Sequence, residues 1–594
     1  MRTMPAPIAR LFQAVTAAAL VVPLLPAVAT AADEPAVIAV VAVDPYADLK
    51  KQAKWVGAQV DQPTLDGFLE SFIMMATQFK GLAGLDVNRP AGVVVTAEGP
   101  AGVPVVRGFV PVKDLAKLLA ALQGVIGPAQ EQDGVQVISP PGMPPIQIVE
   151  KDGWAIITPQ GSPEAAAGLE QALDAVVKSF SLGVQLFPAR MPEGMRKQLE
   201  AVLQQAATMQ AQQGAPVDPE ALKAGIENLA DVETIMLGAN IDVEKERVYV
   251  ENRFAMVAGS AAAVIYDAMA KGTLTVPAGA TADGKPAAMS GHAAMAIPEA
   301  LRAMVKDAVV QALPVSSKTE WSDGQGSGSS ETVVFEPANT IFTLLRKVIP
   351  AMVDAGGIDA ALTVDTTAAE MAEGKAMPAV TVGMKVKDGA ALEADLKAAL
   401  GAKDSLPEGV TVKFDAGKAG AANLHVVEID VAGGGDDTIA RVLGKKLPVT
   451  LGVTPTHAFV ALGGDAEKRI AAAAAGGQTK PDAKPLAGLD VSLASLVAYG
   501  AGTQKLVAPD DAAGIAMATE AAEATAALPS SLVQLLMRPI DRGMATRLSA
   551  DAGAIKVVKT LIEMRSASVQ PQPAGVGPGP VPKGRPIPLP GLAP

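Results

Sequence analysis

The residues that could bind a metal or transfer a proton near neutral pH are three histidines, His292, His425 and His457. They lie in separate segments, and the chain contains neither an HExxH motif nor a His-x-His pair. His425 and His457 both fall in segments with strand character, so they could meet across a sheet and bind a metal. The alternative is two ordinary strand histidines, which the lack of histidines at matching positions in the first half favours. We therefore expect no metal site.

Three other segments resemble functional motifs without completing them. Residues 279–285 read GATADGK, close to a phosphate-binding loop, but Pro286 stands where Ser or Thr would bind Mg²⁺. Ser327 lies among glycines without the spacing of a nucleophile elbow. The GGGDD segment at 433–437 lacks the alternating oxygen ligands of a calcium loop. We predict no catalytic or cofactor-binding residues and no cofactor, although two of the 62 acidic residues could still form a catalytic pair.

Composition excludes several classes of protein. The chain has no cysteine, which rules out disulfides, thiol catalysis and cysteine-based zinc or iron–sulfur sites. Its formal charge of −13 argues against nucleic acid as a main partner, because phosphate binding depends on clustered Lys and Arg. With 594 residues, 49% of them apolar, the chain is long enough for a packed core.

The N-terminus has the pattern of a secretory signal peptide. Two arginines precede an apolar segment at 14–28 that two prolines interrupt. Ala-Thr-Ala at 29–31 is a cleavage site, and Ala-Val-Ala at 27–29 is the alternative site. A membrane anchor is the alternative, but a spanning helix needs about 20 apolar residues. We expect residues 1–31 to be removed, the protein to be exported to the periplasm or beyond the cell, and no membrane span after cleavage.

The elements that must position any site follow a repeated pattern. At 105–127 the apolar period changes from that of a strand to that of a helix after Val-Lys-Asp, and 381–401 repeat the change after a second Val-Lys-Asp. Three more pairs of segments match in the same order: 62–86 with 336–359, 154–164 with 459–467, and 247–269 with 542–564. The pattern indicates a tandem duplication.

We therefore predict an α+β fold with two tandem related halves, each a mostly antiparallel sheet with helices on one face. The predicted organisation is a signal peptide at 1–31, halves at 35–271 and 287–567, a linker at 272–286 and a Pro-rich disordered tail at 568–594. The tail is either a spacer or a docking segment that presents Lys583 and Arg585.

Two local predictions bear on later findings. Asp44 precedes Pro45 and is expected to cap the helix that begins there. The Met- and Phe-rich segment from Phe68 to Phe79 is either a core helix or one wall of a site for an apolar ligand.

Several phrases resemble a known group of proteins. They include AVIAVVAVDPYADLKKQAKWVG from Ala36, GLDVNRPAGVVV from Gly84 and VEKDGWAIITP from Val149. The sequence resembles uncharacterised exported proteins of planctomycete-type bacteria, and this resemblance implies no activity and no site residues.

The leading functional expectation is a non-enzymatic envelope or extracellular protein that acts by interaction, with an unknown protein or cell-wall partner. The signal peptide, the duplication and the incomplete catalytic motifs motivate it. The alternatives are a hydrolase with an unrecognised carboxylate site and a carrier of an apolar ligand.

Overall fold

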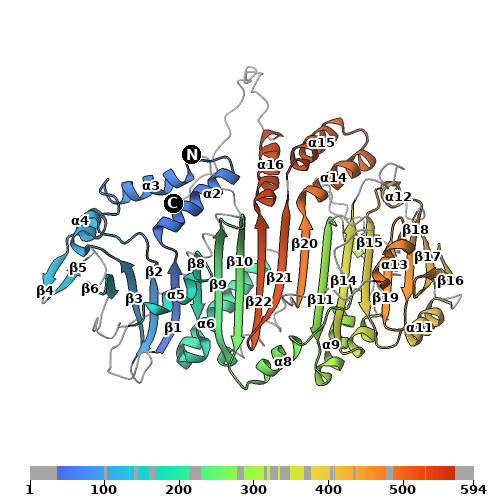
Figure 1. The fold of residues 1–594 in the computed structure, drawn as a ribbon, viewed down its shortest axis with the longest axis horizontal. Helices are drawn as coiled ribbons and strands as arrows, with labels where there is room; N and C mark the ends of the chain where they lie inside the picture. Colours follow the sequence, from blue (N-terminus) through green and yellow to red (C-terminus); the bar gives the residue numbers. More distant parts are fainter. Residues whose placement is uncertain are drawn as a thin grey trace, which may run out of the picture.

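A single antiparallel sheet of 20 strands dominates the fold (Figure 1). The computed structural model describes residues 36–98, 103–132, 134–139, 145–158, 168–212, 229–276, 287–312, 318–320, 332–334, 348–366, 376–401, 406, 409–431, 437–475, 486–528 and 530–568.

The first half contributes ten strands, in the spatial order β4-β5-β6-β7-β3-β2-β1-β8-β9-β10. Their bounds are Ala36–Val43 for β1, Ala91–Glu98 for β2, Val103–Pro111 for β3, Gln130–Gln132 for β4, Val135–Ile138 for β5, Ile146–Lys151 for β6, Trp154–Thr158 for β7, Leu182–Leu186 for β8, Val232–Asp242 for β9 and Arg247–Met256 for β10.

The second half continues the same sheet, because β10 pairs with β22 over Arg247 to Ala255. Its order away from this pair is β22-β21-β20-β11-β14-β15-β19-β18-β17-β16. Its strands are Met289–Ala296 (β11), Gly357–Asp365 (β14), Ala379–Lys385 (β15), Val410–Ala419 (β16), Ala422–Asp430 (β17), Lys446–Val453 (β18), His457–Leu462 (β19), Ala487–Ser492 (β20), Leu532–Ile540 (β21) and Gly543–Asp551 (β22).

The two halves have the same strand order. Each strand can be given a position in the sheet by its distance from the β10–β22 pair. The first strand of each half in the chain then has the same position as the first strand of the other half, and the same holds for all ten strands of the main sheet. A separate hairpin of β12 (Lys318–Glu320) and β13 (Thr332–Val334) lies between β11 and β14 in the chain. The α+β fold class and its antiparallel sheet are confirmed, and the shared order is what a duplication predicts.

Helices follow corresponding strands in both halves. The first half contains α2 (Tyr46–Gln59), α3 (Leu65–Ala76), α4 (Leu115–Ile126), α5 (Gln171–Val177), α6 (Glu193–Gln212) and α8 (Ala261–Met269). The second contains α9 (Glu299–Ala312), α11 (Gly389–Gly401), α12 (Asp437–Leu443), α13 (Ala466–Ala475), α14 (Leu493–Val507), α15 (Ala512–Ala526) and α16 (Ala552–Ser568). Thus α4 and α11 follow β3 and β15, while α5 and α13 follow β7 and β19.

Helices cover both faces of the sheet, rather than one face as the sequence suggested. On β7, Ile156 belongs to the core under α5 with Leu173, whereas Ala155 belongs to the core under α4 with Leu118. Neighbouring residues of a strand point to opposite faces, so α4 and α5 lie on opposite sides. Strands buried on both faces are apolar at successive positions, as in the Trp154–Thr158 strand.

The aspartate of each Val-Lys-Asp segment caps the helix that follows it, whereas the predicted cap at Asp44 is wrong. Asp114 accepts a hydrogen bond from the backbone N–H of Lys117, and Asp388 accepts one from that of Ala391. Asp44 does not cap α2, because its carboxylate instead accepts a hydrogen bond from Gln52 Nε2, at 2.8 Å, from the second turn of the helix.

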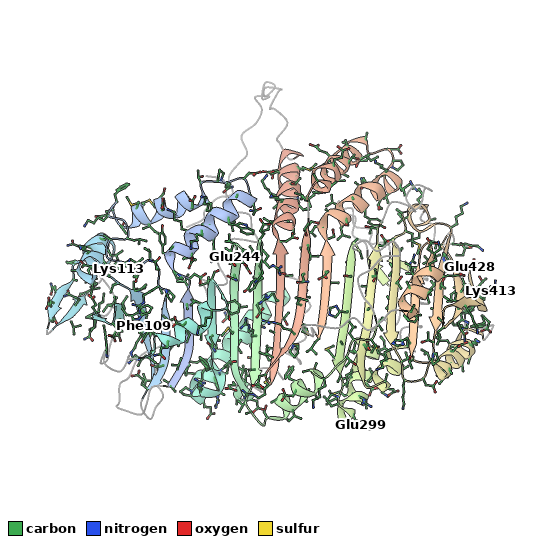
Figure 2. The ribbon with its side chains drawn as sticks, viewed as in Figure 1. Phe109, Lys113, Glu244, Glu299, Lys413 and Glu428 are labelled. Carbon is green, nitrogen blue, oxygen red and sulfur yellow. The ribbon has the colours of Figure 1, made fainter. Side chains whose placement is uncertain are left out.

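The far edge of the sheet carries charged side chains. Lys413 on β16 and Glu428 on β17 lie there (Figure 2). Charges at an edge hinder pairing with another chain. Among the described helices, none combines the length and the apolar run that crossing a bilayer requires.

Candidate functional site

The sheet places His425 and His457 on opposite faces. His425 on β17 is opposite Leu451, and Leu451 is opposite Val460 on β19. His457 is three residues from Val460, so it points to the other face. The hypothesis that these two histidines share a metal is therefore wrong.

His425 instead lies beside two acids that the sequence did not single out. One donor atom from each of Glu393 (α11), Asp415 (β16) and His425 lies within 4.8 Å of the others. However, the ammonium of Lys397 already bridges the two carboxylates, at 2.9 Å from Glu393 Oε1 and 2.8 Å from Asp415 Oδ1. A lysine at this point takes the place that a cation would need.

The protonation of His425 also argues against a metal. Its Nδ1 accepts a hydrogen bond from the backbone N–H of Asp415, at 3.1 Å, so the proton of the neutral ring is on Nε2. A protonated nitrogen cannot ligate a metal. Burial is the main cause that lowers the pKa of His425, against the opposing charge of Glu393. This cluster does not fit a metal ion and is an ionic contact between α11 and the sheet.

His457 belongs to a buried contact that fastens residues 272–276 to the sheet. Its Nε2 lies 3.0 Å from Thr275 Oγ1, and Thr275 Oγ1 donates to Asp359 Oδ2. In a nucleophilic triad the histidine accepts the hydroxyl proton and the acid holds the histidine. Here the acid takes the hydroxyl proton directly, so the arrangement is structural. Burial also lowers the pKa of His292 and His457.

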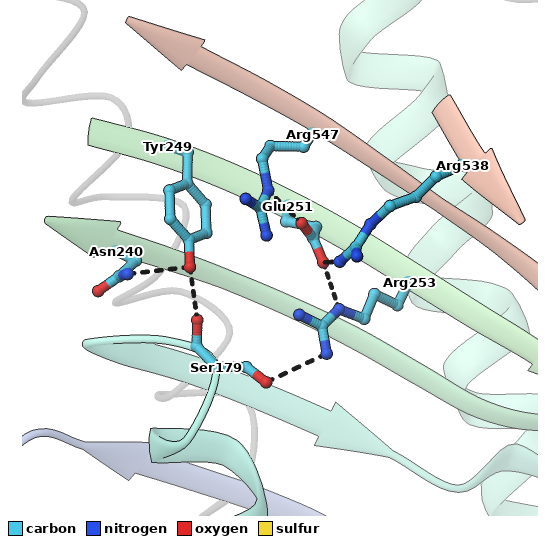
Figure 3. Close-up of polar contacts among 7 residues, drawn as sticks. All are labelled: Ser179, Asn240, Tyr249, Glu251, Arg253, Arg538 and Arg547. Atoms are coloured by element: carbon cyan, nitrogen blue, oxygen red, sulfur yellow. Dashed lines mark hydrogen bonds and ion pairs between the residues drawn. The ribbon is translucent and has the colours of Figure 1, made fainter. Parts of the chain in front are cut away.

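The most concentrated charge cluster among the described residues lies where the two halves join. Glu251 on β10 is fully buried, and the three arginines Arg253, Arg547 and Arg538 pair with it (Figure 3). Arg253 and Arg547 donate through Nε, and Arg538 Nη2 lies 2.9 Å from Glu251 Oε1. Two members come from each half, so the cluster exists only in the joined sheet.

Neighbouring residues orient the cluster. The Arg547 guanidinium lies 4.0 Å from the centre of the Tyr249 ring, and the Tyr249 hydroxyl donates to the backbone carbonyl of Ser179. Asn240 Nδ2 donates to the same hydroxyl, and Arg253 Nη1 donates to Ser179 Oγ (Figure 3). Arg547 is therefore held by stacking as well as by its ion pair.

The cluster carries an excess of positive charge. Burial by itself raises the pKa of Glu251, but hydrogen bonds from Arg253, Arg547 and Arg538 outweigh it and leave the pKa below its ordinary value. Glu251 is therefore ionised at neutral pH. One negative charge faces three positive charges, and in the described part of the chain each of these arginines forms ion pairs with Glu251 alone. The arrangement can bind a further anion.

The opposite face of the same strands is apolar. Leu535, Leu548 and Val250 lie side by side on β21, β22 and β10, and Leu237 lies in the next row on β9. We call these four residues the apolar patch. Leu237, Leu535 and Leu548 are 48%, 41% and 53% exposed. On the solvent-exposed face of an antiparallel sheet the side chains are normally polar, so this patch departs from the usual pattern.

The Met- and Phe-rich helix α3 is also exposed. Phe68 and Met75 on α3 are 65% and 67% exposed, and Phe79, just beyond its end, is 79% exposed. The interpretation of this segment as a core helix is therefore wrong. The sequence could not show this, because the period of a helix reveals an apolar stripe but not what covers it.

An open pocket of about 500 Å³ lies between α4 and strands β5 and β6. Leu115, Leu119 and Ile148 form its apolar wall, with Glu131 and Glu150 among its polar lining residues. In the second half, Glu393 and Lys397 occupy the positions on α11 that correspond to Leu119 and Gln123, counted from the two capping aspartates. The halves thus differ in chemistry at one equivalent place.

Several predicted segments lie outside the described residues: GATADGK at 279–285, Ser327, most of GGGDD at 433–437, the signal peptide and the tail. Reasoning from sequence missed the Glu251 cluster, because its members are as far as 296 residues apart. The available signal was an acid two residues before a basic residue, Glu251 and Arg253, within one predicted strand. Comparisons of the chain with family models, with curated proteins and with solved structures give no match.

Proposed function

We propose that this chain is an exported, non-enzymatic protein of the envelope or the extracellular space that acts by binding another protein or a cell-wall component. The observation that carries the proposal is the apolar patch. Exposed clusters of large apolar side chains on soluble proteins generally mark interaction sites. Burial of apolar surface is favourable, so the three partly exposed leucines give the patch a driving force for association.

The rigidity of the central sheet supports the proposal that the apolar patch is a binding surface. Residues of four neighbouring strands form the patch, and buried ion pairs and a stacked tyrosine hold the strands on the opposite face. A rigid surface loses little conformational entropy on binding.

The test is crosslinking of the tagged full-length protein in its native host, followed by identification of what co-purifies. The variant L535Q/L548Q should lose the partner while remaining folded. The matched control is M304Q on α9, which removes an apolar side chain that is 61% exposed outside the patch. Equal recovery of the partner with both variants would contradict a role for the patch. A copy that ends before residue 569 tests the tail in the same experiment.

Export is tested separately. The N-terminal sequence of the purified protein should begin after residue 29 or 31, and the protein should fractionate outside the cytoplasm. An intact N-terminus on a cytoplasmic protein would overturn this part of the proposal.

A second candidate function, a carrier of an apolar ligand, draws support from the pocket under α4. Its volume of about 500 Å³ is within the range of small-molecule sites, and its wall is apolar. Organic extraction of the native protein should then release a ligand, and the variant L119Q should release less. Extracts without any bound compound would remove this candidate.

The hydrolase alternative requires paired acids with shifted pKa values in a cleft. Asp44 is the described carboxyl group whose pKa is raised, mainly by burial. Its carboxylate accepts a hydrogen bond from the amide of Gln52, in the second turn of α2, so no specific observation favours this alternative.

A further inference from the structure

The charge balance at the junction points to a ligand. Three guanidinium groups surround one carboxylate, and solvent reaches them unequally: the side chains of Arg253 and Arg547 are 25% exposed and that of Arg538 is 45% exposed. Glu251 itself is fully buried beneath them. Two positive charges in a partly dehydrated position repel each other, and an anion between them would remove this repulsion.

Arg547 and Arg538 keep N–H donors that the bonds to Glu251 do not use. Arg547 uses Nε for Glu251, and Arg538 uses Nη2, which leaves further N–H donors on both groups. Arg253 has fewer unused donors, because its Nη1 also donates to Ser179 Oγ. Figure 3 shows Arg547 and Arg538 approaching Glu251 from different strands, with guanidinium nitrogens that make no contact among the residues drawn.

The two arginines are held in place before any ligand arrives. Glu251 fixes one nitrogen of each, and the Tyr249 ring fixes the plane of Arg547. Guanidinium groups recognise planar or tetrahedral oxyanions through paired N–H donors, and a fixed orientation reduces the entropy lost on binding. The buried carboxylate thus acts as the support of a binding site.

We propose that Arg538 and Arg547 bind an oxyanion, a phosphate or carboxylate group, on the face of the sheet opposite the apolar patch. This inference does not depend on the proposed function, because it concerns a different face and a different chemistry. The site is formed by both halves, since Glu251 belongs to the first and both arginines to the second.

The experiment uses the full chain without its signal peptide and follows thermal unfolding and calorimetric titration at constant ionic strength. Inorganic phosphate and succinate are titrated separately, with chloride as the balancing anion. Saturable binding of phosphate alone assigns a phosphoryl ligand, and saturable binding of succinate alone assigns a carboxylate ligand. Binding of both supports recognition of the shared oxyanion geometry. Failure of both to bind more tightly than chloride would overturn the proposal.

The variant R538Q locates the site. Loss of one charged donor should weaken binding by about tenfold or more. Arg538 is the most exposed of the three arginines, so this variant should fold. An unfolding transition of R538Q without anion that matches that of the wild type would show that it does. The control is R542Q on the same hairpin, because Arg542 pairs with Glu233 and Asp541 outside the cluster. Unchanged affinity in R538Q, or equal loss in R542Q, would also overturn the proposal.

Discussion

At the scale of single residues, the chain protects its buried charges by surrounding them with partners. Glu251 is ionised although it is fully buried, because hydrogen bonds from three arginines outweigh the cost of burial. Arg107 is likewise 1% exposed and pairs with Glu98 and Thr96. Burial lowers the pKa of His425, and the backbone N–H of Asp415 donates to Nδ1 of the neutral ring. Each group is thus sensitive to a change that removes its partner or adds a proton.

Replacement of Glu251 by Gln should lower the free energy of unfolding by about 3 kcal/mol at pH 7, because it leaves three guanidinium groups without their carboxylate. The pKa of Glu251 is lowered in the folded protein, so its contribution exists above the ordinary glutamate pKa and is lost as pH falls through the folded value. The difference should therefore shrink below about pH 4.

Equilibrium urea unfolding at pH 7 and pH 3.5 measures this difference. The control E70Q breaks the exposed pair with Lys50 and should leave the unfolding midpoint nearly unchanged. A midpoint in E251Q equal to that of the wild type at pH 7 would show that the junction cluster contributes nothing to stability.

The stability of the wild type should also fall as pH drops below about 6.5, because burial lowers the pKa of His425 in the folded state while the unfolded state takes up a proton. Glu393 and Asp415 face the ring and oppose this effect, whereas Lys397 adds to it. H425Q should reduce the slope of stability against pH between 6.5 and 5 by up to about 1.4 kcal/mol per pH unit. An unchanged slope would contradict the assignment.

At the scale of elements, close packing of helices on strands depends on glycine at particular strand positions. Phe180, which follows α5, is buried against Gly238 on β9 and Gly183 on β8. In the second half, β15 has Gly383 opposite Phe459, whereas β3 has Phe109 opposite Ile156. The phenylalanine thus lies on neighbouring strands in the two halves.

Replacement of Gly238 by Ala should destabilise the protein by about 3 kcal/mol, since the new Cβ would lie 2.1 Å from Phe180 Cγ in a site without room for relaxation. The control is G500A on α14, where no atom lies within 4 Å of the new Cβ and alanine favours the helix. Thermal unfolding of both variants checks this, and equal midpoints would mean that α5 is not tightly packed.

At the scale of the whole molecule, strand pairing joins the halves into one sheet. The pairing of β10 with β22 runs over nine residues of each strand, from Arg247 opposite Asp551 to Ala255 opposite Gly543. The Glu251 cluster adds ionic contacts across this pair, and Arg542 adds another by binding Glu233. Such a continuous backbone ladder is far more rigid than a flexible connection between two domains.

Cleavage of the connection should therefore leave the halves together. If residues 279–285 are replaced by a protease site and cut, the two fragments should elute from a sizing column as one species of the original mass. They should separate only in denaturant. Two separate fragments in native buffer would show that the β10–β22 pair is too weak to join the halves.

The sequence by itself determined the local elements. The change of apolar period at Val-Lys-Asp located two strand–helix pairs, because this pattern depends on neighbours within a few residues. Tertiary structure alone decided that the two sheets merge, that His425 and His457 face apart, and that α3 is exposed. It also brought Glu251 to Arg538 and Arg547. Strand partners and burial depend on residues hundreds of positions away, and one chain's local pattern carries no record of which distant segments meet.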